Sequence, residues 1–174
     1  MIQKLRNPKT VLYQELKNIV LREHFAWFYN KTSHGDLLES ESEWDSFSFF
    51  SHTFLARPNE DHPFPQDQSS FLMLANDVFV EIARENNISP QVLYRANANL
   101  TIPTETGRCG PPHRDHDFPH KNLLVYLTDT NGGDTVVGDE IYSGKEDDII
   151  LFEGEHQGCP PTSDRRVVLV YTFL

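Results

Sequence analysis

The segment Pro111-Pro112-His113-Arg114-Asp115 places an imidazole and a carboxylate two residues apart. In an extended backbone, residues i and i+2 project from the same face, so both side chains can reach one metal ion. An HxD match is short and occurs often by chance, and a surface histidine near an aspartate is the simpler interpretation while nothing else supports a site. Further support must come from other parts of the chain.

Two later residues supply that support. His156 lies 43 positions after His113, where an expected strand ends, and Arg166 opens a final run that is otherwise almost wholly apolar. An unpaired buried charge is costly, so Arg166 needs an anionic partner, which a dicarboxylate would provide. Two histidines and one carboxylate on one face of an octahedral ion leave three positions open, as in non-haem Fe(II) oxygenases.

The elements that must position these residues change type along the chain. Apolar residues recur at helical spacing over residues 10–28, and a second helix is expected over 69–86, with Ser69 or Ser70 as its cap. Residues 30–68 read as loop around one irregular strand at 47–50. Five short strands are then predicted, at residues 92–100, 122–128, 134–137, 148–152 and 165–173.

Helices followed by a series of short strands predict a mostly β (α+β) fold, in which an antiparallel sandwich or barrel is backed by N-terminal helices. The gaps between the late strands are too short for crossover helices, which argues against a parallel sheet. The length of 174 residues fits a single domain.

Composition narrows the class of protein further. The net charge of −11 opposes electrostatic capture of nucleic acid or an anionic membrane. No stretch is apolar for long enough to span a bilayer, so we expect a cytoplasmic protein. In such a reducing compartment Cys109 and Cys159 would remain thiols, although a Cys/His zinc site is an alternative if their segments meet.

The order HxD, GGxT, a later histidine and an arginine ten residues on resembles the prolyl 4-hydroxylase-like 2-oxoglutarate/Fe(II) dioxygenases. The matching segments are PPHRDHDFPH, LLVYLTDTNGGDTVV and IILFEGEHQGCPPTSDRRVVLVYTF, all within the catalytic half. The N-terminal half matches less distinctively, through HFAWFYN and YRANANL. The resemblance implies a double-stranded β-helix, or jelly roll, with the helices packed on one sheet. Residues 1–90 would form a helical support region and residues 91–174 the catalytic core.

The resemblance also implies a set of site residues. His113, Asp115 and His156 would bind Fe(II), and Arg166 would hold the far carboxylate of 2-oxoglutarate, leaving one position for O2. Tyr126 is either a further contact to that carboxylate or a core aromatic residue. The activity implied is hydroxylation of a peptide or small molecule, with release of succinate and CO2.

Several neighbouring residues compete with or modify this assignment. Asn99 shares one strand face with Arg95 and Asn97, and this face either contacts co-substrate or substrate or is simply exposed to solvent. His116 and His120 lack an acidic residue at i+2 and are interpreted as loop residues or as residues that orient a ligand.

Arg165 faces the opposite way from Arg166, and the spacing of ten favours Arg166. The family commonly has glycine where this chain has Asp147-Asp148, so the turn there is expected to differ. The hairpin at residues 138–147 is too short to supply much of a lid.

Two rival functions remain open at this point. One is a cupin-like module that binds iron or zinc without oxygenase activity, and the other is an enzyme of the same fold that uses iron without 2-oxoglutarate. Arg166 discriminates against the first rival, because a module without a 2-oxo acid has no evident need for a cation there.

Overall fold

The computed structural model describes residues 1–32 and 47–174. Residues 33–46, part of the stretch expected to be loop, lie outside the described residues. The described part contains two helices, α1 (Val11–Leu21) and α2 (Leu72–Glu85). Its strands are β1 (Gln3–Leu5), β2 (Phe28–Asn30), β3 (Phe49–Ala56), β4 (Gln66–Asp67), β5 (Leu93–Thr101), β6 (Lys121–Tyr126), β7 (Thr135–Val137), β8 (Glu140–Tyr142), β9 (Ile149–Glu153), β10 (His156–Gly158) and β11 (Arg166–Phe173).

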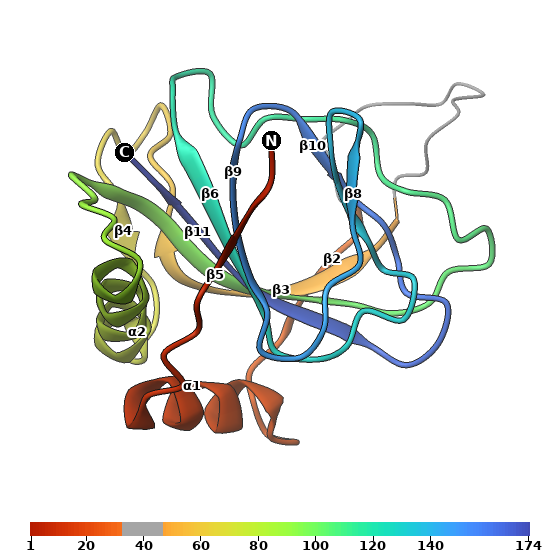
Figure 1. Cartoon of the computed structure of the whole chain (residues 1–174), viewed down its shortest axis with the longest axis horizontal. Helices are drawn as coiled ribbons and strands as arrows, with labels where there is room; N and C mark the ends of the chain where they lie inside the picture. The colour runs from red at the N-terminus through yellow and green to blue at the C-terminus, as the bar shows by residue number, and fades with distance from the viewer. Residues whose placement is uncertain (33–46) are drawn as a thin grey trace.

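The strands form two antiparallel sheets. The large sheet has the order β1-β9-β6-β11-β5-β3-β2, with β4 paired to β3, and the small sheet has the order β10-β7-β8. Both helices lie together on the outer side of the large sheet, while β8 and β10 lie away from them (Figure 1). The predicted mostly β architecture with N-terminal helices on one sheet is confirmed.

Strand β11 shows how the alternation of side chains builds two cores. Val167, Leu169 and Tyr171 belong to the core under the helices, and Val168 and Val170 belong to a second core. The second core also contains residues of β6, β7 and β9. Because neighbouring residues of a strand face opposite ways, Arg166 points into the space between the sheets together with Val168.

The first helix is shorter than its sequence pattern predicts. Thr10 caps it by accepting the backbone N–H of Tyr13 at 3.2 Å, and the helix ends at Leu21 instead of continuing to residue 28. Phe25, which the periodicity assigns to the helical stripe, packs its ring 4.4 Å from that of His52. Tertiary packing of aromatic residues therefore overrides the helical periodicity after residue 21.

The second helix has about the predicted extent, but the predicted cap is wrong: the N-cap residue is Phe71, and no side chain makes a cap hydrogen bond. It covers Leu72–Glu85, and the Ser69 hydroxyl accepts the N–H of Phe71 at 3.2 Å just before it begins. In the described part of the chain, neither helix is long and apolar enough to cross a membrane.

Asp147 occupies the turn at which the resembling family commonly has glycine. Its φ angle is +70°, the left-handed conformation that glycine adopts most easily. The carboxylate accepts hydrogen bonds from Lys17 and from the Tyr13 hydroxyl and pairs with Lys9. Burial raises its pKa, but these partners outweigh burial and lower the pKa to about 2. The turn thus keeps a glycine-like backbone while its side chain links α1 to β9.

Candidate metal centre

The two histidines of the predicted triad are joined through their backbones. His113 and His156 form an isolated antiparallel bridge, in which each backbone N–H donates to the other residue's carbonyl at 2.9 Å. Their rings lie side by side, with centroids 4.4 Å apart. Strand β10, which is too short to show a periodic pattern in the sequence, therefore brings His156 beside the HxD segment.

Asp115 completes the cluster. One ligand atom from each of His113, Asp115 and His156 lies within 4.8 Å of the others. Asp115 Oδ2 is 3.7 Å from His156 Nε2, and the carboxylate is almost completely buried. The structure therefore brings together all three residues that the sequence predicted as metal ligands.

Each of the two imidazoles contacts a backbone carbonyl through its Nδ1 atom. His113 Nδ1 lies 3.2 Å from the carbonyl of Pro111, and His156 Nδ1 lies 3.3 Å from the carbonyl of Gly154. A carbonyl can only accept, so we assign the proton of each ring to Nδ1. Each Nε2 then keeps its lone pair, and the carbonyl contacts fix the ring orientation as the outer partners of metal-bound histidines do.

Charges around the cluster hold two of the ligands in their metal-binding forms. Burial raises the pKa of Asp115, but nearby positive charge, chiefly Arg95, outweighs burial and lowers the pKa to about 2. Burial lowers the pKa of His156 to about 4. At neutral pH the carboxylate is thus ionised and this imidazole is neutral, as metal binding requires. Two imidazole nitrogens and one carboxylate oxygen fit Fe(II) and leave room for further ligands.

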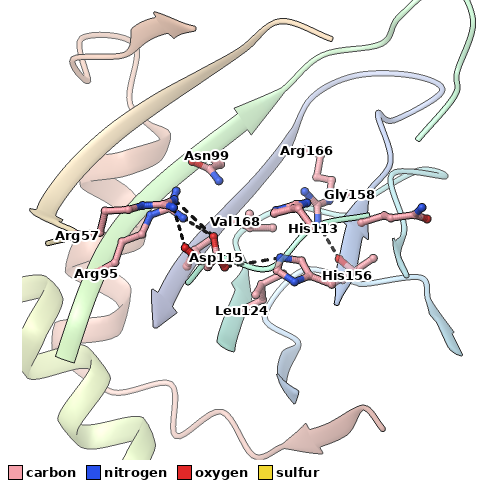
Figure 2. Close-up of a pocket in the computed structure, with 13 residues that line it drawn as sticks. Arg57, Arg95, Asn99, His113, Asp115, Leu124, His156, Gly158, Arg166 and Val168 are labelled. Carbon is pink, nitrogen blue, oxygen red and sulfur yellow. Dashed lines mark hydrogen bonds and ion pairs between the residues drawn. The ribbon is translucent and has the colours of Figure 1, made fainter. Parts of the chain in front are cut away.

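Arg166 lines the same cavity, which has a volume of about 170 Å³, and lies on the side of Asp115 where the two histidines are (Figure 2). The residue is only 6% exposed, its Nη2 donates to Thr135 Oγ1 at 2.9 Å, and its guanidinium lies 5.6 Å from the centre of the Tyr126 ring. Its Nε is buried without a hydrogen-bond partner. Among residues 1–32 and 47–174, no carboxylate forms an ion pair with Arg166.

Gly133 of the GGxT motif makes room for this arginine. A Cβ atom at Gly133 would lie 2.8 Å from Cδ of Arg166 and 2.9 Å from the carbonyl oxygen of Thr130. The glycine thus provides clearance, and Thr135, the threonine of the motif, contacts the guanidinium.

Tyr126 and Asn99 occupy different environments. Tyr126 is fully buried between the sheets, where its hydroxyl bonds Thr135 Oγ1 at 2.8 Å, and it does not line the cavity. Asn99 does line the cavity and accepts a hydrogen bond from Asn97. The face of β5 that carries Arg95 and Asn99 is therefore a cavity wall and not a solvent-exposed surface.

The competing residues lie outside the cavity. His116 bonds Thr172 Oγ1 at 3.0 Å, and His120 bonds the carbonyl of Phe118 at 2.8 Å. Arg165 faces away from Arg166 and reaches the carbonyl of Leu21. None of these three residues has a hydrogen bond to the triad in the described part of the chain.

The expectation of two free thiols is wrong for this structure, because Cys109 and Cys159 form a disulfide. The backbone N–H of Gly110 donates to the carbonyl of Gly158 at 3.0 Å, which places the neighbouring cysteines side by side. The alternative Cys/His zinc site is excluded with the thiols. The disulfide ties the segment before His113 to the segment after His156.

Arg57 is a cavity residue that the sequence reasoning missed. It follows β3 directly, and its Nη1 donates to the backbone oxygen of Asp115 at 2.9 Å. No motif surrounds Arg57, so only the pairing of β3 with β5 reveals its position.

Neither a protein-family model nor a curated protein sequence matches the chain. An oxidoreductase of the 2OG-Fe(II) oxygenase family from Burkholderia pseudomallei matches in structure with a TM-score of 0.67 and 13% identity, over 99% of this chain and 84% of the other.

Two prolyl hydroxylases also match. One, from Trichoplax adhaerens in complex with a hypoxia inducible factor oxygen degradation domain peptide fragment, has a TM-score of 0.57 and 14% identity, over 99% of this chain and 83% of the other. The viral collagen prolyl hydroxylase vCPH from Paramecium Bursaria Chlorella virus-1, in complex with 2OG, has a TM-score of 0.50 and 16% identity, over 72% of this chain and 78% of the other.

These matches define the class of fold. The chain has the double-stranded β-helix, or jelly-roll, fold of 2-oxoglutarate/Fe(II) oxygenases, prolyl hydroxylases included, over nearly its whole length. The fold predicted from the resemblance is thereby confirmed, and it carries an HxD…H triad of the kind that binds iron.

Proposed function

We propose that this chain is an Fe(II)- and 2-oxoglutarate-dependent dioxygenase that hydroxylates an organic substrate and releases succinate and CO2. The observation that carries the proposal is the pairing of a compact two-histidine, one-carboxylate cluster with a buried arginine across one cavity. Either feature alone would fit several classes of protein. Together they match the two ends of a metal-chelating dicarboxylate.

His113, Asp115 and His156 would hold the iron through two Nε2 atoms and one carboxylate oxygen. When iron, 2-oxoglutarate and O2 are bound, the metal supplies oxidative decarboxylation of the co-substrate coupled to oxygen insertion into a C–H bond. The protein contributes a fixed ligand geometry through the backbone bridge between the two histidines and restricts water by burying the carboxylate.

Arg166 would bind the far carboxylate of 2-oxoglutarate by a charge-assisted pair. Its buried guanidinium has an Nε donor without a hydrogen-bond partner, and its Nη2 donates a hydrogen bond to Thr135 Oγ1. Tyr126 would act indirectly, because its hydroxyl bonds the same threonine. Asn99, on the cavity wall, is available to contact co-substrate or substrate.

The cupin-like metal module is disfavoured by Arg166. A buried cation without a protein carboxylate costs free energy that a purely metal-binding module would have no reason to retain. A dianionic co-substrate removes that cost when it binds.

Proteins of this fold differ in substrate, so the fold does not fix what is oxidised. The Trichoplax match is a complex with a peptide fragment, and a peptidyl proline or another protein side chain is one substrate class that we propose. A small molecule is the other. The cytoplasmic location also stays a prediction, and the disulfide argues against it, since reducing compartments rarely retain such bonds.

The test begins with binding and then proceeds to turnover. Purified protein is titrated anaerobically with Fe(II) and then with 2-oxoglutarate, and the metal-to-ligand charge-transfer absorption of the chelate is recorded. Succinate is then measured after O2 is admitted. We expect wild type to give both signals, His113→Ala and His156→Ala to lose both, and His24→Ala, an exposed histidine far from the cluster in sequence, to match wild type. Absence of both signals in wild type would refute the proposal.

A further inference from the structure

Two arginines besides Arg166 line the cavity, both against the same metal ligand. Arg95 Nη1 donates to Asp115 Oδ1 at 2.7 Å, and Arg57 Nη2 lies 3.5 Å from that oxygen while its Nη1 bonds the Asp115 backbone. Figure 2 places Arg57 and Arg95 together on one side of Asp115 and Arg166 beyond the histidines. The Asp115 carboxylate therefore forms ion pairs with two guanidinium groups.

The charges of the cavity do not balance. Among the described residues that line it, Asp115 is the only acidic one, against three arginines. Under the proposed function, divalent iron and dianionic 2-oxoglutarate cancel each other, so the cavity keeps an excess of two positive charges. This excess occurs in a chain whose net charge is −11.

The excess charge can be reached from the cavity. Arg57 and Arg95 have hydrogen bonds only to Asp115 in the part of the chain that the structure describes. The Arg95 nitrogens that Asp115 leaves unpaired are not among the buried, unpartnered atoms, so solvent can reach them. The Arg57 side chain is 44% exposed and lies at the mouth, whereas that of Arg95 is 17% exposed.

We infer that Arg57 and Arg95 form a recognition site for a carboxylate or phosphate group on the substrate, next to the carboxylate that holds the metal. The inference rests on the proposed function and narrows its substrate class to anionic compounds. A guanidinium presents two parallel N–H donors that match the paired oxygens of these groups. An anion bound there would place a neighbouring C–H bond beside the metal ligands.

A purely structural role, in which both arginines serve only to position Asp115, is the simpler alternative. Arg95 alone satisfies that need, because it is largely buried and makes the short contact to Oδ1. Arg57 adds a contact to a backbone oxygen and leaves the rest of its guanidinium at the mouth. Arg57 is therefore the residue whose replacement separates recognition of an anion from support of the metal ligand.

The experiment measures binding of matched charged and neutral probes. Protein loaded anaerobically with Fe(II) and 2-oxoglutarate is titrated calorimetrically with benzoate and benzamide, and with phenyl phosphate and phenol. The same titrations are made on Arg57→Gln, on Arg57→Lys, and on Arg84→Gln, which removes one positive charge from an exposed position on α2.

We expect wild type and Arg84→Gln to bind at least one charged probe about ten- to a hundredfold more tightly than its neutral partner. Arg57→Gln should lose this preference, and Arg57→Lys should retain part of it. The charged probe that binds more tightly identifies carboxylate or phosphate as the preferred group. Equal binding of charged and neutral probes, no binding of either, or a preference that survives in Arg57→Gln would overturn the inference. The charge-transfer absorption of the loaded protein tests the proposed function separately.

Discussion

Replacement of Arg166 by methionine should affect the empty protein and the co-substrate complex in opposite ways. Methionine has a similar length and no charge, so it can fill the same space in the cavity wall. In the empty protein the guanidinium is 6% exposed and lacks a carboxylate partner in the described residues. In the complex, the same group would hold the far end of 2-oxoglutarate.

The magnitudes follow from the contacts of the side chain. The substitution removes one hydrogen bond to Thr135, worth about 1 kcal/mol, and a cation–π contact with Tyr126, worth about 1–2 kcal/mol. It also removes a desolvation cost of several kcal/mol for an unpaired buried ion. The free energy of unfolding of the empty protein should therefore stay the same or rise.

For 2-oxoglutarate the effect should be large. Loss of one partner from a buried ion pair costs about 3–5 kcal/mol, which corresponds to roughly a hundred- to several-thousandfold in affinity. Urea unfolding of the metal-free protein and anaerobic titration with 2-oxoglutarate measure the two effects. Arg165→Met, on the outward face of the same strand end, is the matched control and should leave the affinity unchanged.

If Arg166→Met binds 2-oxoglutarate as tightly as wild type, the guanidinium has no part in holding the co-substrate. Strong destabilisation of the empty Arg166→Met variant, without the same loss in Arg165→Met, would also contradict the prediction. That result would mean that Arg166 has a structural partner beyond Thr135 and Tyr126.

Three further predictions concern the surroundings of the site. Gly133→Ala should force Arg166 aside and cost about 1–3 kcal/mol in unfolding free energy by overpacking, with weaker 2-oxoglutarate binding in the same titration. Joint replacement of Cys109 and Cys159 by serine should cost about 2–4 kcal/mol in urea unfolding and weaken Fe(II) binding, whereas unchanged values would show that the bond does not stabilise the site. Asp147→Asn should lose about 2 kcal/mol of stability at neutral pH. The pKa of Asp147 in the folded protein is about 2, below its ordinary value of 3.8, so the stability that this carboxylate contributes is present above about pH 4 and is lost as the pH falls toward 2. The difference in unfolding free energy between Asp147→Asn and wild type should therefore close over that pH range, which acid unfolding measures.

The sequence revealed those parts of the site that depend on short-range spacing. His113 and Asp115 lie two residues apart in an extended segment, and the alternation of β11 separates Arg166 from Arg165. The long strands β5 and β11 were also located to within about a residue, because β5 alternates polar residues with alanine and β11 is an almost continuous apolar run of strand length.

Features created by long-range pairing were not visible in the sequence. Arg57 and Asp115 are 58 residues apart in the sequence, and Cys109 and Cys159 are 50 residues apart. No local sequence pattern predicts either contact. Strand β10 has three residues, too few for any periodicity. The early end of α1 at Leu21 depends on aromatic packing around His52, which again joins distant segments.

The position of β11 within the large sheet has a consequence for how the protein folds. This strand, the last of the sequence, lies between β6 and β5, and those two strands do not pair with each other. Until β11 is synthesised, the sheet consists of two separate halves with open, hydrogen-bonding edges. A nascent chain would have to keep these edges from pairing with other molecules, and a truncated product lacking residues 166–174 would expose both of them and be prone to aggregate.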